Sequence, residues 1–117
     1  MSRFEGLEVW ERSARLCADL YKALSSLNNF GFRDQITRSA LSVPSNIAEG
    51  YERSSPRETV NFLNYAKGSA GELRTQVYIG LDIGYISSEQ AQHWIKESEE
   101  ISRMLYGLMK SVRERKQ

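Results

Sequence analysis

The sequence is poor in the residues that staple small domains or bind metals. Its 117 residues include one cysteine, Cys17, and one histidine, His93. A single cysteine excludes an intramolecular disulfide and a zinc site built from cysteines. No apolar run approaches the roughly 18 residues that span a bilayer, and the first residues lack the apolar core of a signal peptide. We therefore expect a cytoplasmic protein that does not enter a membrane.

Proline, glycine and net charge are also scarce. Two prolines and eight glycines do not favour a turn-rich all-β domain, whereas 40% apolar and 26% charged residues are typical of a globular protein. Lysine and arginine number 16 against 15 acids, a net charge of +1. This balance argues against a strongly electrostatic nucleic-acid binder but leaves room for a local basic patch. The length predicts a single domain, residues 1–117.

Apolar residues recur at intervals of three and four over four stretches, which predicts four amphipathic helices at about residues 5–27, 32–52, 55–83 and 87–112. The expected buried seams are, in chain order, Leu7, Trp10, Ala14, Cys17, Tyr21 and Leu24; Ile36, Ala40, Val43, Ile47 and Tyr51; Leu63, Ala66, Ala70, Leu73 and Val77; and Ala91, Trp94, Ser98, Ile101, Leu105, Leu108 and Val112. Short connections make consecutive helices antiparallel neighbours. The sequence thus predicts an all-α, antiparallel up-down-up-down four-helix bundle.

Local signals place several helix ends. Ser55 followed by Pro56 predicts an N-cap and a first helical residue for the third helix. Ser87 and Gln90 have the spacing of a capping box for the fourth helix. Gly84 predicts the C-terminal end of the third helix, because glycine adopts the left-handed conformation common just beyond a helix.

Three residues disturb the expected helices. Pro44 lies inside the second helix, where it removes a backbone donor and predicts a kink or a short break. Gly68 and Gly71 lie inside the third, and each costs about 1 kcal/mol relative to alanine. We expect a tight packing contact, within the chain or between subunits, to explain both glycines.

The second and third helices each carry a polar stripe beside the apolar seam. The two stripes are Gln35, Arg38, Ser42, Asn46, Glu49 and Arg53, and Glu58, Asn61, Tyr65, Ser69, Glu72 and Gln76. Asparagine, glutamine and serine have little advantage on an exposed helix, so we expect at least one stripe to lie at a subunit interface. The alternative is two solvated faces. The candidate interface residues are Gln35, Arg38, Asn46, Glu49, Arg53, Glu72 and Gln76, and the spacing of Glu49 and Arg53 also predicts an ion pair.

No group of residues has the spacing of a catalytic or metal site. His93 falls among exposed positions of the fourth helix, and Cys17 occupies a seam position that favours a small core residue over a nucleophile. Glu97, Glu99 and Glu100 lack the loop geometry of a cation site. We expect no catalytic residue, no metal and no cofactor, and therefore no enzyme.

A basic cluster at the C-terminus is the candidate nucleic-acid surface. The last 15 residues carry five cations against Glu114, a local charge of +4. These bases also complement the dipole of the fourth helix, which is the competing explanation. Tyr65 and Tyr78 offer stacking surfaces, or else pack within the bundle. The candidate binding residues are Arg103, Lys110, Arg113, Arg115 and Lys116, with Lys67 and Arg74, and with Arg57 and Arg33 as extensions.

Residues 42–50, SVPSNIAEG, followed by Arg53, resemble the signature of the 23S rRNA intervening-sequence protein family, whose members are also called four helix bundle proteins. Asn28 and Asn29 depart from the family pattern of a proline and an acidic residue, and Gly71 and Gly80 replace alanine-like residues. Further matches lie at residues 7–10, Ala14, Gln35, Arg38, 62–63, 66–69, 72–73, 75–76 and 81–85.

The family is similar in fold and assembly to accessory proteins of diversity-generating retroelements, which form pentamers of four-helix subunits, bind nucleic acid and partner a reverse transcriptase. The resemblance therefore implies a bacterial, non-enzymatic homo-oligomer, a pentamer, that binds structured RNA or DNA. The family name records where some members are encoded and not a ribosomal function. The alternative is a protein-interaction scaffold or an accessory subunit for another polypeptide, such as a reverse transcriptase-like enzyme.

Overall fold

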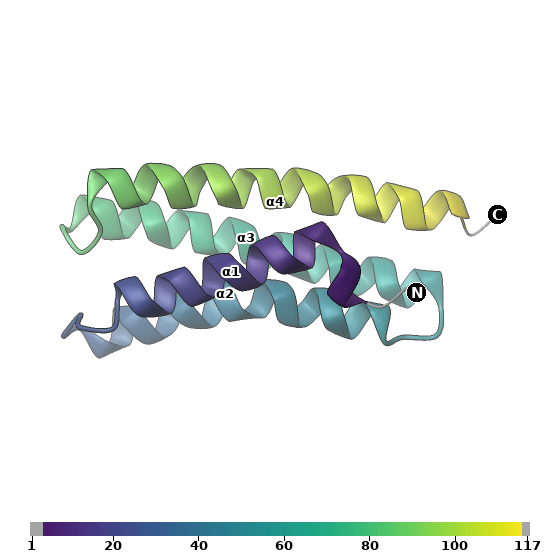
Figure 1. The fold of residues 1–117 in the computed structure, drawn as a ribbon, viewed down its shortest axis with the longest axis horizontal. Helices are drawn as coiled ribbons and strands as arrows, with labels where there is room; N and C mark the ends of the chain where they lie inside the picture. Colours follow the sequence, from purple (N-terminus) through teal and green to yellow (C-terminus); the bar gives the residue numbers. More distant parts are fainter. Residues whose placement is uncertain (1–3, 116–117) are drawn as a thin grey trace.

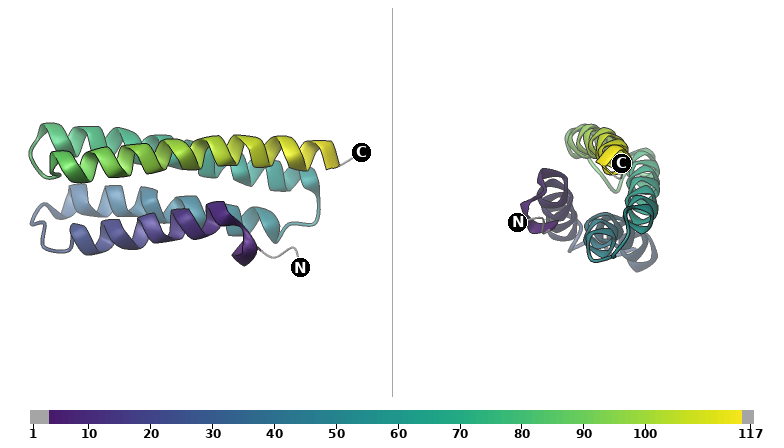
Figure 2. Two further views of the ribbon diagram at one scale, coloured as in Figure 1. Left: turned by 45° about the horizontal axis from the view of Figure 1, so that its top comes forward. Right: turned by 90° about the vertical axis from the view of Figure 1, so that its right-hand side faces the viewer.

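The computed structural model describes residues 4–115. They form a short 3-10 turn, Phe4–Gly6, and four α-helices, α1 (Glu8–Ala23), α2 (Phe30–Tyr51), α3 (Pro56–Asp82) and α4 (Ser88–Arg115). Consecutive helices run antiparallel, and the end-on view places α1 diagonally from α3, and α2 diagonally from α4 (Figures 1 and 2). The bundle measures 49 × 20 × 19 Å. The prediction of an all-α up-down-up-down bundle is confirmed.

The predicted seams of α2, α3 and α4 form most of the core. All five seam residues predicted for α3 are buried, and α2 differs only at Tyr51, which is half-buried at the edge of the core. In α4, Met109 is buried where the sequence pattern predicted Leu108, which is half-buried. Ala66 and Ala70 keep the centre of the α3 seam small, and α3 has extensive contact with both α2 and α4.

The predicted seam of α1 is wrong at several positions. Tyr21 is 47% exposed, Leu7 and Trp10 are half-buried at the edge of the core, and Ala14 is also only half-buried. The side chains that α1 buries are Val9, Ser13, Leu16, Cys17, Leu20 and Leu24. The apolar pattern did not predict this seam because one of its buried positions is the polar residue Ser13. Its hydroxyl donates to the Trp10 carbonyl at 3.1 Å, so it enters the core with its hydrogen bond made.

The helix ends follow the predicted capping signals. Ser55 Oγ accepts from the Glu58 backbone N–H at 3.2 Å, and Ser87 and Gln90 form the predicted reciprocal capping box with both hydrogen bonds at 3.1 Å. Gly84 has φ +84° just beyond α3, and the Tyr85 N–H donates back to the carbonyl of residue 80 at 2.8 Å. This arrangement is a Schellman motif, which stops α3 at the predicted place.

Two expectations about helix interiors are corrected. α2 continues through Pro44 without the expected break, and a bend of its axis there stays a prediction. A Cβ added to Gly68 would meet no atom within 4 Å, and one added to Gly71 would meet only the Arg74 guanidinium at 3.9 Å. The expected tight contact at these glycines is therefore absent within residues 4–115, which leaves a contact between subunits as the open explanation.

Close approach occurs instead where α2 ends against the start of α3. A Cβ on Gly50 would lie 3.1 Å from the Thr59 carbonyl oxygen and 3.0 Å from Phe62 Cβ. Thr59 Oγ1 donates to the Gly50 carbonyl at 2.8 Å across this contact. Because backbone cannot yield as a flexible side chain can, Gly50 fixes how tightly the α2–α3 turn closes.

We predict opposite effects for two glycine-to-alanine changes. Gly50→Ala should lower the free energy of unfolding by about 1–3 kcal/mol, since the new methyl group overpacks against the α3 backbone. Gly68→Ala should raise it by up to about 1 kcal/mol, because alanine is the better helix former and has room. Urea unfolding followed by circular dichroism measures both. Equal effects of the two changes would contradict the assigned role of Gly50.

Candidate functional site

Basic residues of α4 line one side of the helix. Arg103, Tyr106, Lys110 and Arg113 follow one another at spacings of three, four and three, so they share a face. Arg113 lines a pocket together with Val60 of α3, which shows that the Arg113 end of this row lies toward α3. Tyr106, in the middle of the row, is 60% exposed.

Basic residues of α3 lie on the side that faces this row. Val60, Lys67 and Arg74 are seven residues apart and therefore share a face of α3. Val60 contributes to the pocket shared with α4, and Arg74 Nη1 donates to Ser98 Oγ of α4 at 3.2 Å. We call the surface along the α3–α4 seam the basic face; its cations are Arg57, Lys67, Arg74, Arg103, Lys110 and Arg113.

Most cations of the basic face have no acid partner. Within residues 4–115, Arg103 is the only one paired with a carboxylate, that of Glu100 at 3.4 Å. Arg74 is half-buried and is held by Ser98, so it is less available to a ligand than the sequence suggested. Glu99 and Glu114 lie one turn from Arg103 and Lys110, respectively, on the same helix. The exposed cations of the basic face are therefore Arg57, Arg103, Lys110 and Arg113, whereas Lys67 is half-buried like Arg74.

Two acids of α4, Glu97 and Glu100, lie against Arg12 of α1. Arg12 of α1 donates from Nη2 to Glu97 Oε1 at 2.8 Å and from Nε to Glu97 Oε2 at 2.9 Å, and it lies 3.5 Å from Glu100. These hydrogen bonds lower the pKa of Glu97 below its usual value, against burial, which raises it. The same pair raises the pKa of Arg12. The two sides of α4 therefore differ in charge.

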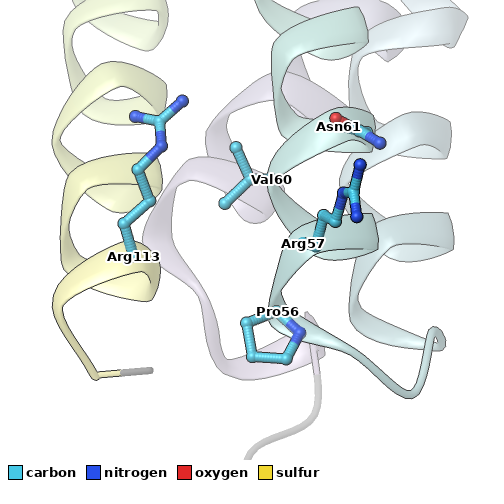
Figure 3. Close-up of a pocket in the computed structure, with 5 residues that line it drawn as sticks. All are labelled: Pro56, Arg57, Val60, Asn61 and Arg113. Carbon is cyan, nitrogen blue, oxygen red and sulfur yellow. The ribbon is translucent and has the colours of Figure 1, made fainter. Parts of the chain in front are cut away.

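The basic face ends in a pocket of about 380 Å³ between the start of α3 and the end of α4. Figure 3 shows Val60 between the two helices, with Arg113 on the α4 side and Arg57 beside Asn61 on the α3 side. Pro56 closes the lower end of the pocket in this view. Cationic walls thus flank an apolar floor.

A second pocket, of about 290 Å³, shares Pro56 with the first. Arg115 and Arg53 line it, and so does Tyr51, whose buried hydroxyl has no hydrogen-bond partner in the described part of the chain. Burial raises the pKa of Tyr51, and the nearby Arg115 guanidinium opposes this shift without reaching hydrogen-bonding geometry. The hydroxyl therefore stays protonated at neutral pH and able to donate.

The polar stripes of α2 and α3 meet at their centres. Ser42 Oγ and Ser69 Oγ lie 2.8 Å apart across the two helices, and Asn46 Nδ2 donates to Ser42 Oγ at 2.9 Å and to the Ser42 carbonyl at 2.8 Å. Gln76 Oε1 is buried without a partner within residues 4–115. The centre of the stripes is therefore a packed polar contact between α2 and α3 and not two solvated faces.

The ends of the stripes remain accessible. Gln35, Arg38 and Glu72 are exposed. Arg53 Nη2 forms the predicted ion pair with Glu49 Oε2 at 2.6 Å, and its guanidinium lies 4.6 Å from the centre of the Phe62 ring.

The remaining sequence candidates divide as follows. Arg115 lies at the second pocket and away from the row of Arg113, and Lys116 lies outside the described residues. Tyr65 and Tyr78 are 57% and 52% exposed, so neither is a core residue of the bundle. The sequence analysis did not propose Tyr106 or Tyr51 as binding residues. The spacing of Tyr106 between Arg103 and Lys110 was a readable signal, whereas nothing in the sequence indicated that the Tyr51 hydroxyl would lack a partner.

No set of three His, Cys, Asp or Glu side chains within residues 4–115 is placed to hold a metal ion. None of the four helices has an apolar stretch long enough to cross a membrane. Cys17 is buried, as its seam position predicted, and burial raises the pKa of its thiol.

The fold and these surfaces define a small four-helix bundle whose distinctive features are its polar and basic faces. Over residues 5–107 the sequence matches the 23S rRNA-intervening sequence protein family, and the chain belongs to this family. A crystal structure of a protein with unknown function from the S23 ribosomal protein family of Bacteroides thetaiotaomicron is similar, with a TM-score of 0.81 and 28% sequence identity over 87% of this chain and 98% of that one. The comparison with curated proteins gave no match.

The Arg12–Glu97 pair predicts a specific pH dependence of stability. Because the pKa of Glu97 is lowered by folding, its contribution is present above the unfolded-state pKa and is lost as the pH falls through the folded-state value. Glu97→Gln should reduce the free energy of unfolding at pH 7 by about 1.5–3 kcal/mol. The difference from the unmodified protein should shrink toward pH 3. Urea unfolding across this range measures it, with the exposed Glu89→Gln as the control; a difference that stays constant with pH would contradict the assignment.

Proposed function

We propose that this protein is a non-catalytic homo-oligomer that binds RNA or DNA through the basic face. The observation that supports this proposal is the row of cations along the α3–α4 seam, most of which have no acid partner in the described part of the chain. Phosphate contacts from lysine and arginine supply most of the affinity for nucleic acid, and a symmetric oligomer repeats a modest patch around its axis. A chain of net charge +1 thereby gains affinity without a high charge per subunit.

Assembly through the α2–α3 surface is the second part of the proposal, and the family resemblance implies a pentamer. Gly68 is exposed on α3 and has open space where a side chain would fit. Ile79 near the end of α3 and its C-cap residue Ile83 are 47% and 53% exposed. A second copy of the chain would cover these groups. The cytoplasmic location also stays part of the proposal.

The same exposed isoleucines favour a second candidate function. A different polypeptide, such as a reverse transcriptase-like enzyme, would bury Ile79 and Ile83 as effectively as a second copy does. Apolar docking depends little on salt, whereas phosphate binding weakens steeply as salt rises. Salt dependence therefore distinguishes the scaffold from the nucleic-acid binder.

Nucleic-acid binding should depend on two exposed residues of α4. Fluorescence anisotropy with a structured RNA and a single-stranded DNA, at salt from 50 to 200 mM, measures affinity and its salt slope. Lys110→Gln with Arg113→Gln should reduce the slope of log K against log salt by about 1.4–1.8, since two phosphate contacts are lost. Lys22→Gln with Arg15→Gln on α1 removes the same charges elsewhere and should leave the slope unchanged. No binding at the lowest salt would refute the proposal for this protein.

Assembly should depend on Arg38, which is exposed and has no ion pair or hydrogen bond within residues 4–115. Arg38→Glu should therefore leave the folded subunit intact and lower the mass measured by light scattering. Arg15→Glu, an equal charge reversal on exposed α1, is the matched control. An unchanged mass in the Arg38 variant would favour the solvated-surface interpretation of this part of the stripe.

A further inference from the structure

The pocket at the end of the basic face contains apolar as well as cationic side chains, and a phosphate alone would contact only the cations. A surface that binds only backbone phosphates requires cations and hydrogen-bond donors. This pocket also has an apolar floor, formed by Val60 and Pro56, and a volume of about 380 Å³, within the range of small-molecule sites. An occupant that uses the whole pocket has both an anionic and a flat apolar part.

The anionic part has two arginines to bind it. Arg57 lines the pocket from α3 and Arg113 lines it from α4, and neither has an ion pair or hydrogen bond within residues 4–115. The guanidinium fork matches two oxygens of a phosphate, and an arginine without an acid partner has its donors available.

The apolar part would lie over the floor beside Asn61. Figure 3 shows the Asn61 amide next to Arg57 at the α3 wall. An amide both donates and accepts, as recognition of a base edge requires. In a duplex these edges are paired, and bases are reached in pockets only when they are unpaired.

We propose that this pocket holds one nucleotide of a single-stranded nucleic acid, with its phosphate between Arg57 and Arg113 and its base over Val60 and Pro56. The inference rests on the proposed nucleic-acid binding and specifies its substrate as unpaired RNA or DNA.

The surroundings give the strand a path in both directions. Toward the middle of α4, Lys110 and the exposed ring of Tyr106 offer a phosphate contact and a stacking surface. Beyond Pro56, the second pocket adds the Arg115 guanidinium. Alternating cations and aromatic rings are typical of proteins that bind single strands.

The test compares strands and a pocket-filling variant of the full chain. Labelled 12-nucleotide oligo-dT and oligo-U, and a 12-base-pair DNA duplex, are titrated at one salt concentration by fluorescence anisotropy. Both single strands should bind at least about fivefold more tightly than the duplex. Val60→Phe fills the pocket without changing charge, and it should weaken single-strand binding at least about fivefold while leaving the duplex affinity unchanged.

Two further variants keep the result interpretable. Thr75→Phe adds the same ring at an exposed position of α3, about four turns from Val60, and should change nothing. Arg57→Gln, also at an exposed position, replaces Val60→Phe if that variant does not fold, and should weaken single-strand binding by a similar factor.

The outcomes separate this inference from the function on which it rests. Equal or tighter duplex binding, or single-strand affinity that is unchanged in the folded pocket variant, would overturn the pocket assignment while nucleic-acid binding stands. A preference for oligo-U or oligo-dT alone would assign the pocket to RNA or to DNA. Absence of binding to all three probes at low salt would overturn the proposed function and the pocket with it.

Discussion

Burial of the α3 seam is the constraint on which the other surfaces depend. α3 packs against both α2 and α4, and its seam has alanines at positions 66 and 70 where the helices come together. Once this seam faces the core, the spacing of a helix fixes where every other α3 side chain lies. Ser69 and Gln76 then flank α2, whereas Lys67 and Arg74 flank α4. One hydrophobic stripe thus separates a polar flank from a basic one.

Charge is segregated across α4 although the chain as a whole is nearly neutral. On the α1 side, Arg12 donates hydrogen bonds to Glu97 and lies near Glu100. Lys110 and Arg113 have no acid partner within residues 4–115. The helix-dipole explanation for bases near the end of α4 accounts for their position along the helix. It does not account for their position around the helix, which brings them beside Arg57.

Sequence patterning predicted the seams of α3 and α4 closely because their buried positions are almost all apolar. It failed in α1, where Ser13 is buried with its hydroxyl bonded to its own helix, and where Leu7 and Trp10 supply a competing apolar row. The expected close packing at Gly68 was also wrong, and Gly50 has the close contact instead. Gly68 has open space in the folded chain, whereas Gly50 meets the α3 backbone, and this difference depends on a neighbour distant in the fold and invisible to helix propensity.

The sequence by itself determined the four helices, their caps, the inward faces of α2, α3 and α4, and the family, because these depend on side-chain spacing and on interactions within a few residues. Only the tertiary structure decided which polar groups meet. It brought Arg57 and Arg113 to one pocket from opposite ends of the second half of the chain, placed Ser42 against Ser69, and left the Tyr51 hydroxyl without a partner. Such juxtapositions depend on how far and in what rotation two helices pack, and no local pattern specifies that rotation to the width of one side chain.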